Sequence, residues 1–403
     1  MRTRIAVVGA GPAGLVLSNV LHQAGIEHRV LERRTREEVE NTPRAGLVEH
    51  RVVEYLRRQG LADHLLVEGT QHGWCDVVCG GERFRLDYDG LTGGDRHWIY
   101  PQQLLLRDLL GELDKLDRAP EFETPVDRVQ LRPGAGAVVH GPGFELACDY
   151  VIGCDGAQSA VAECLPAAAS SNVQHRHPYD WITILADLTA PVEGIRYAIH
   201  ENGFAGMMPR AGSFGRLYLQ APADDDLARW PEERLRAELD LRLGVDAQRP
   251  GVERLREVDV LRMRSGIARS LRWGSALLAG DAAHVLTPSG AKGMNLAIAD
   301  AADLAESLVR RYRGRDGTAL ASYGSRRRAH ARRILGFSEE LLGLLHLPPE
   351  SADPAGELET RRRRVRELAG SGPEAERFAR EYVGSGELPM PAPARERSTP
   401  WRS

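Results

Sequence analysis

Two glycine-containing segments far apart in the chain have the residue types that bind a nucleotide cofactor. The first is GAGPAG at residues 9–14, and the second is the pair Gly280-Asp281 followed by GAKGMN at residues 290–295. Glycines allow a tight turn and a close approach of the backbone to phosphate groups, and the carboxylate of Asp281 can accept hydrogen bonds from hydroxyl groups. Two such segments predict a long dinucleotide held at both ends, which favours FAD over a hydride carrier that binds and leaves.

The first segment lies in the context that a dinucleotide-binding fold requires. Residues 4–8 have the pattern of a buried strand, residues 15–24 that of a helix, and residues 28–31 that of a second strand ending at Glu32. In such a unit the helix N-terminus faces the pyrophosphate, and an acid after the second strand accepts hydrogen bonds from ribose hydroxyls. A plain surface acid is the alternative interpretation of Glu32. The pattern predicts a Rossmann-like FAD-binding domain.

The rest of the chain predicts an α/β protein that also contains an α+β substrate sheet. Residues 139–154 and 275–279 have strand patterns, and a helix is expected from Gly290 to about residue 308. Alternating segments between residues 179 and 263 indicate an antiparallel sheet, interrupted by a short helix at 232–243. We therefore expect an FAD-binding domain at 1–178 and 264–310 (with 72–98 contributing to the substrate side), a substrate-binding domain at 179–263, a helical region at 311–383 and a disordered tail at 384–403.

Composition excludes several other classes of protein. The 403 residues carry a net charge of −4, with 42% hydrophobic and 27% charged residues, so nothing draws the whole chain to nucleic acid or to a membrane. The arginine runs at 326–328 and 361–364 are interpreted as solvated helix faces. The 5 cysteines lack zinc-type pairs, so we expect reduced thiols, no metal site and a cytoplasmic protein. No apolar run has the roughly 20 residues that a membrane-spanning helix needs.

Taken in order, these motifs resemble those of the class A flavoprotein aromatic hydroxylases, which are single-component FAD monooxygenases. The resemblance covers nearly the whole chain and depends on the first glycine motif with Glu32, on Cys154-Asp155-Gly156 and on Gly280-Asp281. The spacing is most similar to that of the 4-hydroxybenzoate 3-hydroxylases. The resemblance implies that NADPH or NADH reduces FAD, that O2 then forms a flavin C4a-hydroperoxide, and that this species hydroxylates an aromatic substrate.

The resemblance also implies which residues hold the cofactor. The pyrophosphate and the adenosine ribose are expected at Gly9, Gly11, Gly14 and Glu32. The helix that follows Gly290 is expected to direct its positive end at the N1–C2 edge of the flavin ring, which would stabilise the reduced anion. For the other phosphate, ribityl and ring contacts, the matching residues are Arg44, Gln102, Asp155, Asp281, Lys292 and Asn295.

A second set of matching residues is expected to act on the substrate. Tyr197 matches a tyrosine that binds the substrate phenol, Tyr382 its partner, and His72 the outer end of a proton path, while the carbonyl group of Pro288 is expected to face the phenol. A phenol bound to a tyrosine pair becomes more like a phenolate and therefore more reactive at its ortho carbon, and a histidine can take up the proton at physiological pH.

The same resemblance assigns four further positions to binding of the substrate carboxylate, to flavin movement and to the nicotinamide. Arg210 and Tyr218 match groups that hold a substrate carboxylate, for which an arginine fork gives planar two-point recognition. Arg216 matches an arginine associated with flavin movement, and Arg264 one that is associated with the nicotinamide. A small aromatic acid is therefore the expected partner, and the family likeness also suggests a homodimer.

Other positions depart from the pattern of the family. A serine that would complete the carboxylate site is replaced by Met208, and a leucine of the pocket by Gly206. We expect the first change to remove a hydrogen bond and the second to open space, so that 4-hydroxybenzoate becomes a poor substrate and a larger indole-type or amino-substituted aromatic acid is preferred. The alternative is that Met208 points away and that the chain is a 4-hydroxybenzoate 3-monooxygenase proper. Gln158 and Ala162 replace a histidine and an arginine that help to bind NADPH, which leaves the coenzyme preference open.

Two other classes of function remain open from the sequence. One is an FAD oxidase or reductase with the same fold that inserts no oxygen. The other is a binding protein that has kept the fold without catalysis, against which the matches at His72, Tyr197, Arg210 and Tyr382 speak.

Overall fold

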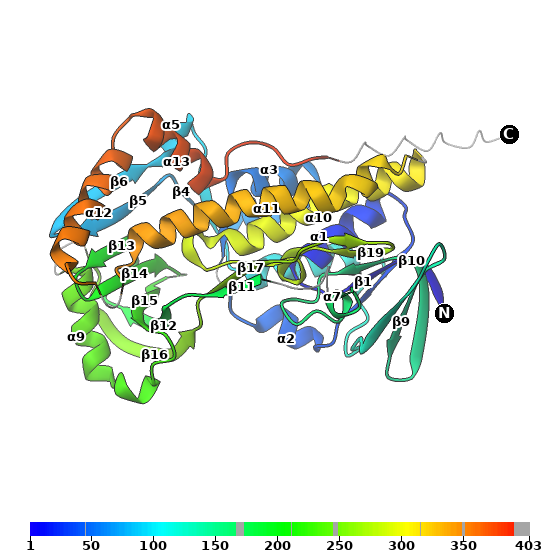
Figure 1. Cartoon of the computed structure of the whole chain (residues 1–403), viewed down its shortest axis with the longest axis horizontal. Helices are drawn as coiled ribbons and strands as arrows, with labels where there is room; N and C mark the ends of the chain where they lie inside the picture. Colours follow the sequence, from blue (N-terminus) through cyan, green and yellow to red (C-terminus); the bar gives the residue numbers. More distant parts are fainter. Residues whose placement is uncertain are drawn as a thin grey trace.

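The computed structural model describes residues 1–44, 46–166, 173–210, 212–244, 249–314, 316–348 and 351–390. Two large sheets lie at opposite ends of the molecule and long helices run between them, as Figure 1 shows. The expected disordered tail lies outside the described residues from position 391 onward. The expectation of a mixed α/β fold is confirmed.

The first large sheet contains both ends of the predicted nucleotide-binding unit. Its strand order is β18-β19-β10-β1-β2, with the β8–β9 hairpin attached to β10, and the β19-β10-β1-β2 pairs are parallel. Helix α1 packs against both α10 and α6. The elements are β1 (Arg2–Val8), α1 (Pro12–Gln23), β2 (His28–Leu31), α6 (Gln102–Asp114), β8 (Arg128–Arg132), β9 (Gly136–Gly141), β10 (Phe144–Gly153), β18 (Arg272–Trp273), β19 (Ala276–Leu278) and α10 (Lys292–Arg313).

The second large sheet combines the expected substrate segment with two earlier strands. Its order is β16-β12-β15-β14-β13-β5-β6, and its pairs are antiparallel apart from β13–β5. Helix α9 covers one face, where Leu235 and Leu239 pack into a separate hydrophobic cluster. The elements are β5 (Trp74–Cys79), β6 (Glu82–Asp87), β12 (Tyr179–Leu188), β13 (Ile195–His200), β14 (Gly203–Pro209), β15 (Phe214–Pro222), α9 (Glu232–Leu243) and β16 (Val252–Leu261).

Three C-terminal helices cover the other face of the second sheet. They are α11 (Thr318–Leu345), α12 (Pro354–Leu368) and α13 (Pro373–Val383), and Phe337, Leu341 and Phe378 from this set pack into the same hydrophobic cluster as Tyr197 of β13. Helix α11 is the long orange helix that crosses from one large sheet to the other in Figure 1. This face of the second sheet is therefore covered by helices from the end of the described chain.

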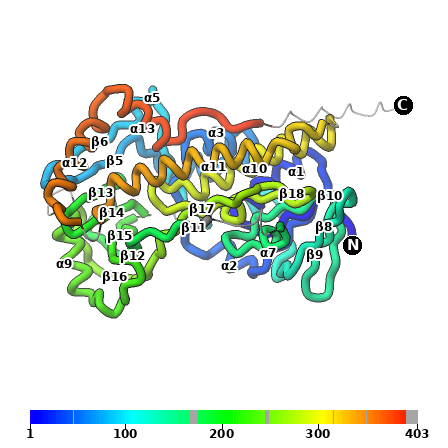
Figure 2. The backbone as a smooth tube through the Cα atoms, viewed as in Figure 1, coloured from blue at the N-terminus to red at the C-terminus, as the bar shows by residue number. Residues whose placement is uncertain are grey.

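Two small sheets connect the larger units. One has the order β3-β7-β4, from Leu47–Val48, His97–Ile99 and Thr70–His72, and the other has the order β11-β17-β20, from Val173–Arg176, Arg264–Ile267 and His284–Val285. The tube in Figure 2 shows the chain passing between the two large sheets more than once before it reaches α11. The remaining helices are α2 (Arg36–Asn41), α3 (His50–Arg58), α4 (Asp63–Glu68), α5 (Tyr88–Thr92) and α7 (Ala160–Glu163).

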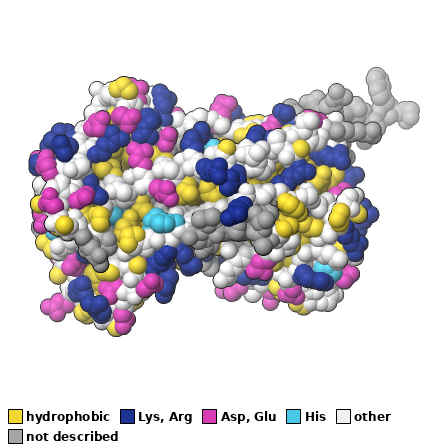
Figure 3. All heavy atoms as spheres, viewed as in Figure 1, with side chains coloured by type: hydrophobic (Ala, Val, Ile, Leu, Met, Phe, Trp, Pro, Cys, Tyr) yellow, Lys and Arg dark blue, Asp and Glu magenta, His cyan; other side chains and the backbone are white. Residues whose placement is uncertain are grey.

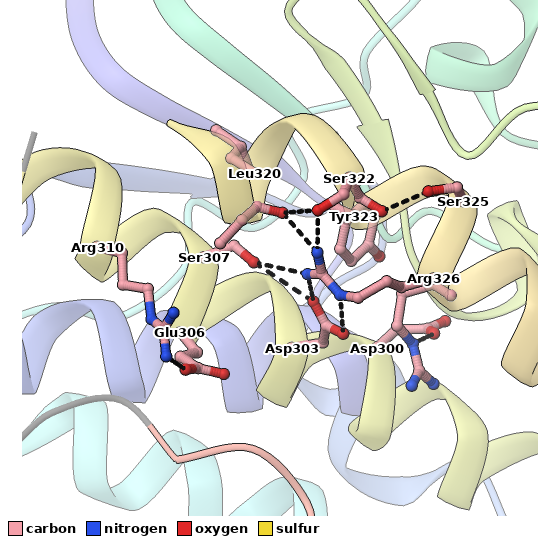
Figure 4. A network of polar contacts seen from close by, with 12 residues as sticks. Asp300, Asp303, Glu306, Ser307, Arg310, Leu320, Ser322, Tyr323, Ser325 and Arg326 are labelled. Atoms are coloured by element: carbon pink, nitrogen blue, oxygen red, sulfur yellow. Dashed lines mark hydrogen bonds and ion pairs between the residues drawn. The ribbon is translucent and has the colours of Figure 1, made fainter. Parts of the chain in front are cut away.

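Helices α10 and α11 are joined by buried and half-buried ion pairs. The guanidinium of Arg326 donates to Asp303 Oδ1 at 2.5 Å and to Ser307 Oγ at 3.2 Å (Figure 4). One turn earlier on α10, Asp300 accepts a 2.7 Å hydrogen bond from Arg327 Nε. The run at 326–328, expected as a solvated face, is thus partly internal, because two of its arginines neutralise carboxylates of α10.

The charged surface side chains are mixed in sign, and the cysteines are free thiols. On the face shown in Figure 3, basic and acidic side chains are interspersed. All 5 cysteines lie in the described part of the chain and none of them forms a disulfide. Within the described residues, no helix is both long and apolar enough to cross a lipid bilayer.

Candidate active site

The GAGPAG loop makes a turn that tolerates no side chain at two of its glycines. A Cβ atom on Gly14 would lie 2.0 Å from the carbonyl oxygen of Gly9, and one on Gly9 would lie 2.3 Å from the carbonyl oxygen of Cys154. Gly9 also has φ +104, a backbone conformation that favours glycine. At Gly11 the nearest atom to such a Cβ is 4.0 Å away, so the loop is open at this position. Pro12 then begins α1, whose first N–H groups have no partner within the helix.

Glu32 lies at the end of β2 beside this loop, as the sequence predicts. Its Oε2 accepts a hydrogen bond of 2.7 Å from the backbone N–H of Ala10, and its Oε1 accepts one of 3.0 Å from the N–H of Arg34. The side chain is buried. Because each carboxylate oxygen has two lone pairs, Glu32 both fixes the glycine loop and keeps the capacity to accept a ribose hydroxyl.

Asp281 lies in a short helical turn that a buried carboxylate holds in place. Asp300 Oδ2 accepts hydrogen bonds from the N–H of Gly280 at 3.0 Å and from His284 Nε2 at 2.6 Å. Burial acts to raise the pKa of Asp300, but His284 and Arg327 outweigh it and lower the pKa to about 2. Asp300 was missed by the sequence reasoning, which offered no signal for it.

The carboxylate of Asp281 itself faces solvent, and no hydrogen-bond or ion-pair partner for it is found among the described residues. Neighbouring protein atoms nevertheless raise its pKa by desolvation, whereas the charges of His284 and Arg44 act to lower it. Arg44, which is also exposed, is therefore close enough to influence Asp281 although the two residues lie far apart in the sequence. These two predicted cofactor residues are brought to the same region.

Of two further predicted cofactor residues, Gln102 lies at the start of α6 and Asp155 beside the start of α7. Gln102 is the half-buried first residue of α6, beside a close approach of two loops, where a Cβ on Gly46 would lie 2.1 Å from the carbonyl oxygen of Tyr100. Asp155 accepts a 2.5 Å hydrogen bond from Ser159 Oγ and a 3.4 Å bond from the N–H of Val161. Its carboxylate thus stabilises the start of α7, and its role toward a cofactor stays a prediction.

Lys292 is more deeply enclosed than the sequence suggests. Its ammonium donates to Glu49 Oε1 at 2.6 Å, to the carbonyl oxygen of Glu381 at 2.8 Å and to that of Tyr382 at 2.7 Å. An ammonium has three donors, so none is left for a ligand, and this differs from the direct cofactor contact expected. Burial lowers the pKa of Lys292, against the opposing effect of Glu49. Burial raises the pKa of Glu49, but Lys292 and Arg51 lower it to about 2.

Asn295 also connects α10 to the segment around Glu49, and its contact with a cofactor stays a prediction. Its Oδ1 accepts a 2.8 Å bond from the N–H of Glu49, and its Nδ2 donates to the carbonyl oxygens of Leu47 and Ala291, both at 2.9 Å. The helix begins at Lys292, two residues later than expected, after a 3-10 turn (Ser289–Ala291). Lys292 and Asn295 therefore hold the segment from Leu47 to Glu49 against the start of α10.

Tyr197 and Tyr382 form the pair that the sequence reasoning expected. Their hydroxyl oxygens are 2.9 Å apart, and both side chains are buried. Burial raises the pKa of each tyrosine well above its ordinary value, so both hydroxyls stay protonated at neutral pH. Tyr197 comes from β13 and Tyr382 from α13, which are 185 residues apart in the chain.

His72 lies near this pair, but a second histidine stands between them. His72 of β4 is the register partner of His97 of β7, and no hydrogen bond of the His72 side chain is found among the described residues. His97 is fully buried, its Nε2 lies 2.9 Å from the carbonyl oxygen of Tyr382, and its ring makes an edge contact with the Tyr382 ring at 5.1 Å. Burial and Lys292 lower the pKa of His97 to about 3, so it is neutral. Sequence reasoning missed His97.

Pro288, whose carbonyl was expected to face the substrate phenol, is half-buried beside the start of α10. Its carbonyl oxygen accepts a 2.9 Å hydrogen bond from the N–H of Ala291. A carbonyl oxygen has a second lone pair, so this turn does not prevent it from accepting another hydrogen bond. Its contact with a substrate stays a prediction.

The residues expected to bind a carboxylate share one region of the second sheet. Gly206 pairs with both Tyr197 and Tyr218, which places the three residues in one row on the same face. Arg216 lies two positions from Tyr218 and faces the same way. The half-buried Arg210 follows β14 and is near Tyr218 and Arg216, whose charges affect its pKa; desolvation lowers that pKa.

No partner for the guanidinium groups of Arg210 and Arg216 is found among the described residues. A buried or half-buried arginine without a carboxylate is energetically costly, and an anionic substrate would satisfy it. Arg264 is exposed on β17, where its backbone pairs with Arg176, and it is therefore not part of this group.

The two departures from the family pattern have different outcomes. Met208 pairs with Arg216 and packs against the cluster that contains Tyr197, so it faces the site and does not point away. At Gly206, by contrast, no space is opened, because a Cβ would lie 2.9 Å from Cζ of Phe204. The Phe204 ring is fully buried and stacks on Trp181 at 4.9 Å. The expectation of a larger cavity at Gly206 therefore needs correction, since the ring fills the position.

The residues present fit a dinucleotide cofactor. The glycine loop is open at Gly11, α1 offers N–H groups to phosphates, and the carboxylate of Asp281 has an accessible face beside the basic Arg44. Beyond them, the tyrosine pair and the unneutralised Arg210 can bind the hydroxyl group and the carboxylate of one small molecule. The arrangement thus suits a redox cofactor and a phenolic acid between the two sheets.

Comparison with known proteins agrees with this arrangement. The sequence profile of a family described as an FAD binding domain matches residues 2–338. A p-hydroxybenzoate hydroxylase of Acinetobacter baylyi is 30% identical over 356 residues, which cover 86% of this chain and 87% of that protein. A 3-(3-hydroxy-phenyl)propionate/3-hydroxycinnamic acid hydroxylase of Mycolicibacterium smegmatis is 28% identical over 362 residues, or 83% of this chain, and this chain spans 60% of its length.

The fold is also similar to that of solved structures. The p-nitrophenol 4-monooxygenase from Pseudomonas putida superposes with a TM-score of 0.78, covering 95% of this chain and 97% of that chain. The sequence identity is 20%, so this likeness bears on the fold alone.

Proposed function

Because this chain belongs to the class A flavoprotein aromatic hydroxylases, and is therefore an FAD-dependent aromatic monooxygenase, we propose that it hydroxylates a small phenolic acid at the expense of NADPH or NADH and O2. The first sheet would bind FAD and the inserted second sheet the substrate. When bound, FAD supplies the oxidising chemistry. The protein binds and orients the substrate, accepts the proton of the substrate phenol in a hydrogen bond and excludes water.

The observation that carries this proposal is the contact between two buried hydroxyl groups, those of Tyr197 and Tyr382, at 2.9 Å. In such a pair one hydroxyl donates to the other, so a substrate phenol placed at Tyr197 would extend the line to three hydroxyls along which a proton can shift. Partial transfer of the phenol proton enriches the ortho carbon in electrons, which is what an electrophilic oxygen donor requires.

The protein environment holds the pair in its neutral, hydrogen-bonding form. Tyr382 is fixed through its own carbonyl oxygen, which accepts from Lys292 Nζ at 2.7 Å and lies 2.9 Å from His97 Nε2. Its hydroxyl is surrounded by buried side chains, including Cys75, whose thiol pKa is raised to about 12 by burial. A dry environment of this kind also protects a reactive oxygen donor from water.

The other end of the substrate would meet Arg210 and Tyr218. The guanidinium of Arg210 supplies the positive charge for a carboxylate, and Tyr218 can add a hydroxyl donor. Met208 offers no hydrogen bond beside them. Because Phe204 fills the position next to Gly206, the proposal favours a single-ring acid over the larger indole-type acids considered from the sequence.

The test is a panel of aromatic acids in which substrate-stimulated NADPH and NADH oxidation is measured and products are identified by mass. We expect stimulated oxidation with a product heavier by one oxygen atom for at least one hydroxybenzoate-sized acid. Nicotinamide oxidation with hydrogen peroxide but no oxygenated product from any acid would instead favour an oxidase or reductase. A purified protein that binds no FAD would contradict both.

A further inference from the structure

A hollow of about 820 Å³ lies at the edge of the first large sheet, and neither residue of the tyrosine pair lines it. It is bounded by the loop around β18 on one side and by the first half of α11 on the other. Dark blue side chains of Lys and Arg follow α11 on the face shown in Figure 3. The side chains that matter for its chemistry are Arg269, Arg272, Trp273, Arg328 and Arg332.

The charge of this hollow is entirely positive. Among the described residues that line it there are four arginines and no Asp or Glu, although the whole chain has a net charge of −4. Arg269 and Arg332 are exposed, and their guanidinium groups have no partner in the described part of the chain. Burial lowers the pKa of Arg328, and the nearby charges of Arg332 and Arg269 lower it further. Like charges that face one another in this way are stabilised by a bound anion.

Trp273 adds a second kind of recognition. Its side chain is 48% exposed, which makes it one of the few large hydrophobic side chains that the described surface presents to solvent. It lies on β18 next to Arg272, whose guanidinium is held by the carbonyl oxygens of Leu320 at 2.6 Å and Gly274 at 3.4 Å. An exposed indole beside arginines suits a ligand with both a planar ring and phosphate groups.

Two of the arginines that follow Glu32 are already used within the protein. Arg34 forms an ion pair with Glu32 at 3.1 Å, and Arg36 forms ion pairs with Asp114 at 2.5 Å and Glu40 at 2.6 Å. Two positions at which the family pattern has a histidine and an arginine that help to bind NADPH are the uncharged Gln158 and Ala162 in this chain. None of these four positions offers an unpaired basic group, whereas the hollow offers Arg269 and Arg332.

The hollow is connected to the expected flavin site by short contacts. Arg328 Nε donates to the carbonyl oxygen of Ala268 at 3.1 Å, and the N–H of Ala268 donates to the carbonyl oxygen of Ala283 at 2.8 Å, two residues after Asp281. Along α11, Ser338 lies six residues beyond Arg332, or about 9 Å at 1.5 Å per residue, and its hydroxyl donates to the carbonyl oxygen of Ser289 at 3.2 Å.

We propose that this hollow binds the adenosine phosphate end of the nicotinamide reductant, with the phosphates on Arg269, Arg328 and Arg332 and the adenine ring on Trp273. The inference deepens the proposed function, since only a reductant-dependent enzyme needs such a site. It places coenzyme recognition on the β18 loop and α11 and not on the uncharged positions 158 and 162.

The test is calorimetric titration of the FAD-loaded protein with 2′,5′-ADP, ADP and inorganic phosphate, which needs no turnover. Replacing Arg269 and Arg332 together by alanine is expected to weaken 2′,5′-ADP binding roughly a hundredfold, at about tenfold for each charged contact. Trp273→Ala is expected to weaken both nucleotides about tenfold while leaving inorganic phosphate unchanged. Arg132→Ala, an exposed arginine on β8, is the matched control and should bind as the wild type does.

The outcomes separate this proposal from the proposed function. Weaker 2′,5′-ADP binding with a raised KM for NADPH and an unchanged kcat supports the site, and weaker ADP binding would extend it to NADH. Nucleotide binding that the Arg269/Arg332 variant leaves unchanged overturns it, even if hydroxylation is observed. A change in oligomeric mass of the variants with unchanged nucleotide affinity also overturns it and assigns the hollow to an interface between copies. Because Arg269 and Arg332 have no partners in the described residues, their loss should leave folding intact.

Discussion

The contact between Gly206 and Phe204 makes a double-substitution experiment possible. In the structure a Cβ on Gly206 would lie 2.9 Å from Cζ of Phe204 and 3.4 Å from Cδ2 of Tyr218. The Phe204 ring cannot move aside easily, because it is fully buried and lies 4.9 Å from the Trp181 ring and 4.7 Å from the His346 ring. Gly206→Leu should therefore be destabilising although leucine suits a strand.

The expected magnitudes follow from these contacts. Overpacking by Gly206→Leu should cost about 1–3 kcal/mol, and the cavity left by Phe204→Ala about 3–5 kcal/mol. In the double variant the leucine occupies part of the space that the ring leaves. The two effects should then be less than additive, with a coupling of about 2 kcal/mol in favour of the double variant.

The assay is urea unfolding of the FAD-loaded protein, followed by circular dichroism for the wild type, both single variants and the double variant. Independent effects that add to within about 0.5 kcal/mol would refute the reasoning, because they would mean that ring and side chain do not compete for the same space. A functional measurement accompanies it. Phe204→Ala should extend the range of aromatic acids that stimulate nicotinamide oxidation to bulkier compounds, and the leucine in the double variant should reverse that gain.

Three further predictions concern the pair of hydroxyls, the cofactor and pH. Tyr197→Phe should retain flavin reduction but lose hydroxylation, seen as nicotinamide oxidation with peroxide release and little product; equal loss of both half-reactions would exclude a role in ring activation. Asp281→Ala should weaken FAD binding about tenfold to a hundredfold, because the loss of a charged hydrogen-bond acceptor costs about 1.5–3 kcal/mol. An unchanged affinity for FAD would show that Asp281 does not bind the cofactor. Folding lowers the pKa of Glu49 from 4.5 and that of Asp300 from 3.8, both to about 2. The stability that the two ionised carboxylates contribute is present above their ordinary pKa values and should be lost as the pH falls from about 4.5 toward 2. The measurement is the thermal unfolding midpoint as a function of pH, and a midpoint that does not change across this window would contradict the assignment.

The local parts of the fold could be predicted from the sequence because short-range patterns determine them. The strand, glycine turn and helix at the start of the chain follow from apolar runs and from glycines that no other residue could replace, as the 2.0 Å approach at Gly14 shows. The helix at 232–243 was expected with the bounds found. The pairing of Tyr197 with Tyr382 is different, since it was expected from the family resemblance and not from periodicity.

What could not be predicted depends on contacts between distant residues. Nothing in the sequence indicates that Lys292 would use all its donors on Glu49 and on two carbonyl oxygens of α13. The same holds for Asp300, whose partners come from three separate elements, and for Phe204, which fills the space that Gly206 alone suggested was open. A side chain's role in such cases is set by which segments the topology brings together.

The position of Tyr382 has a consequence for the order in which the site is completed during synthesis. Tyr382 lies on α13, the last helix of the described chain, and this helix also supplies two of the three acceptors of the Lys292 ammonium. A growing polypeptide that has made both large sheets would therefore still lack the partner hydroxyl of Tyr197 and would leave a buried lysine poorly satisfied. In the proposed function, cofactor binding can precede this step, but activation of a phenol by the tyrosine pair cannot. On this proposal the enzyme gains the ability to activate a substrate last, after the surfaces that would hold its cofactor and its substrate have formed.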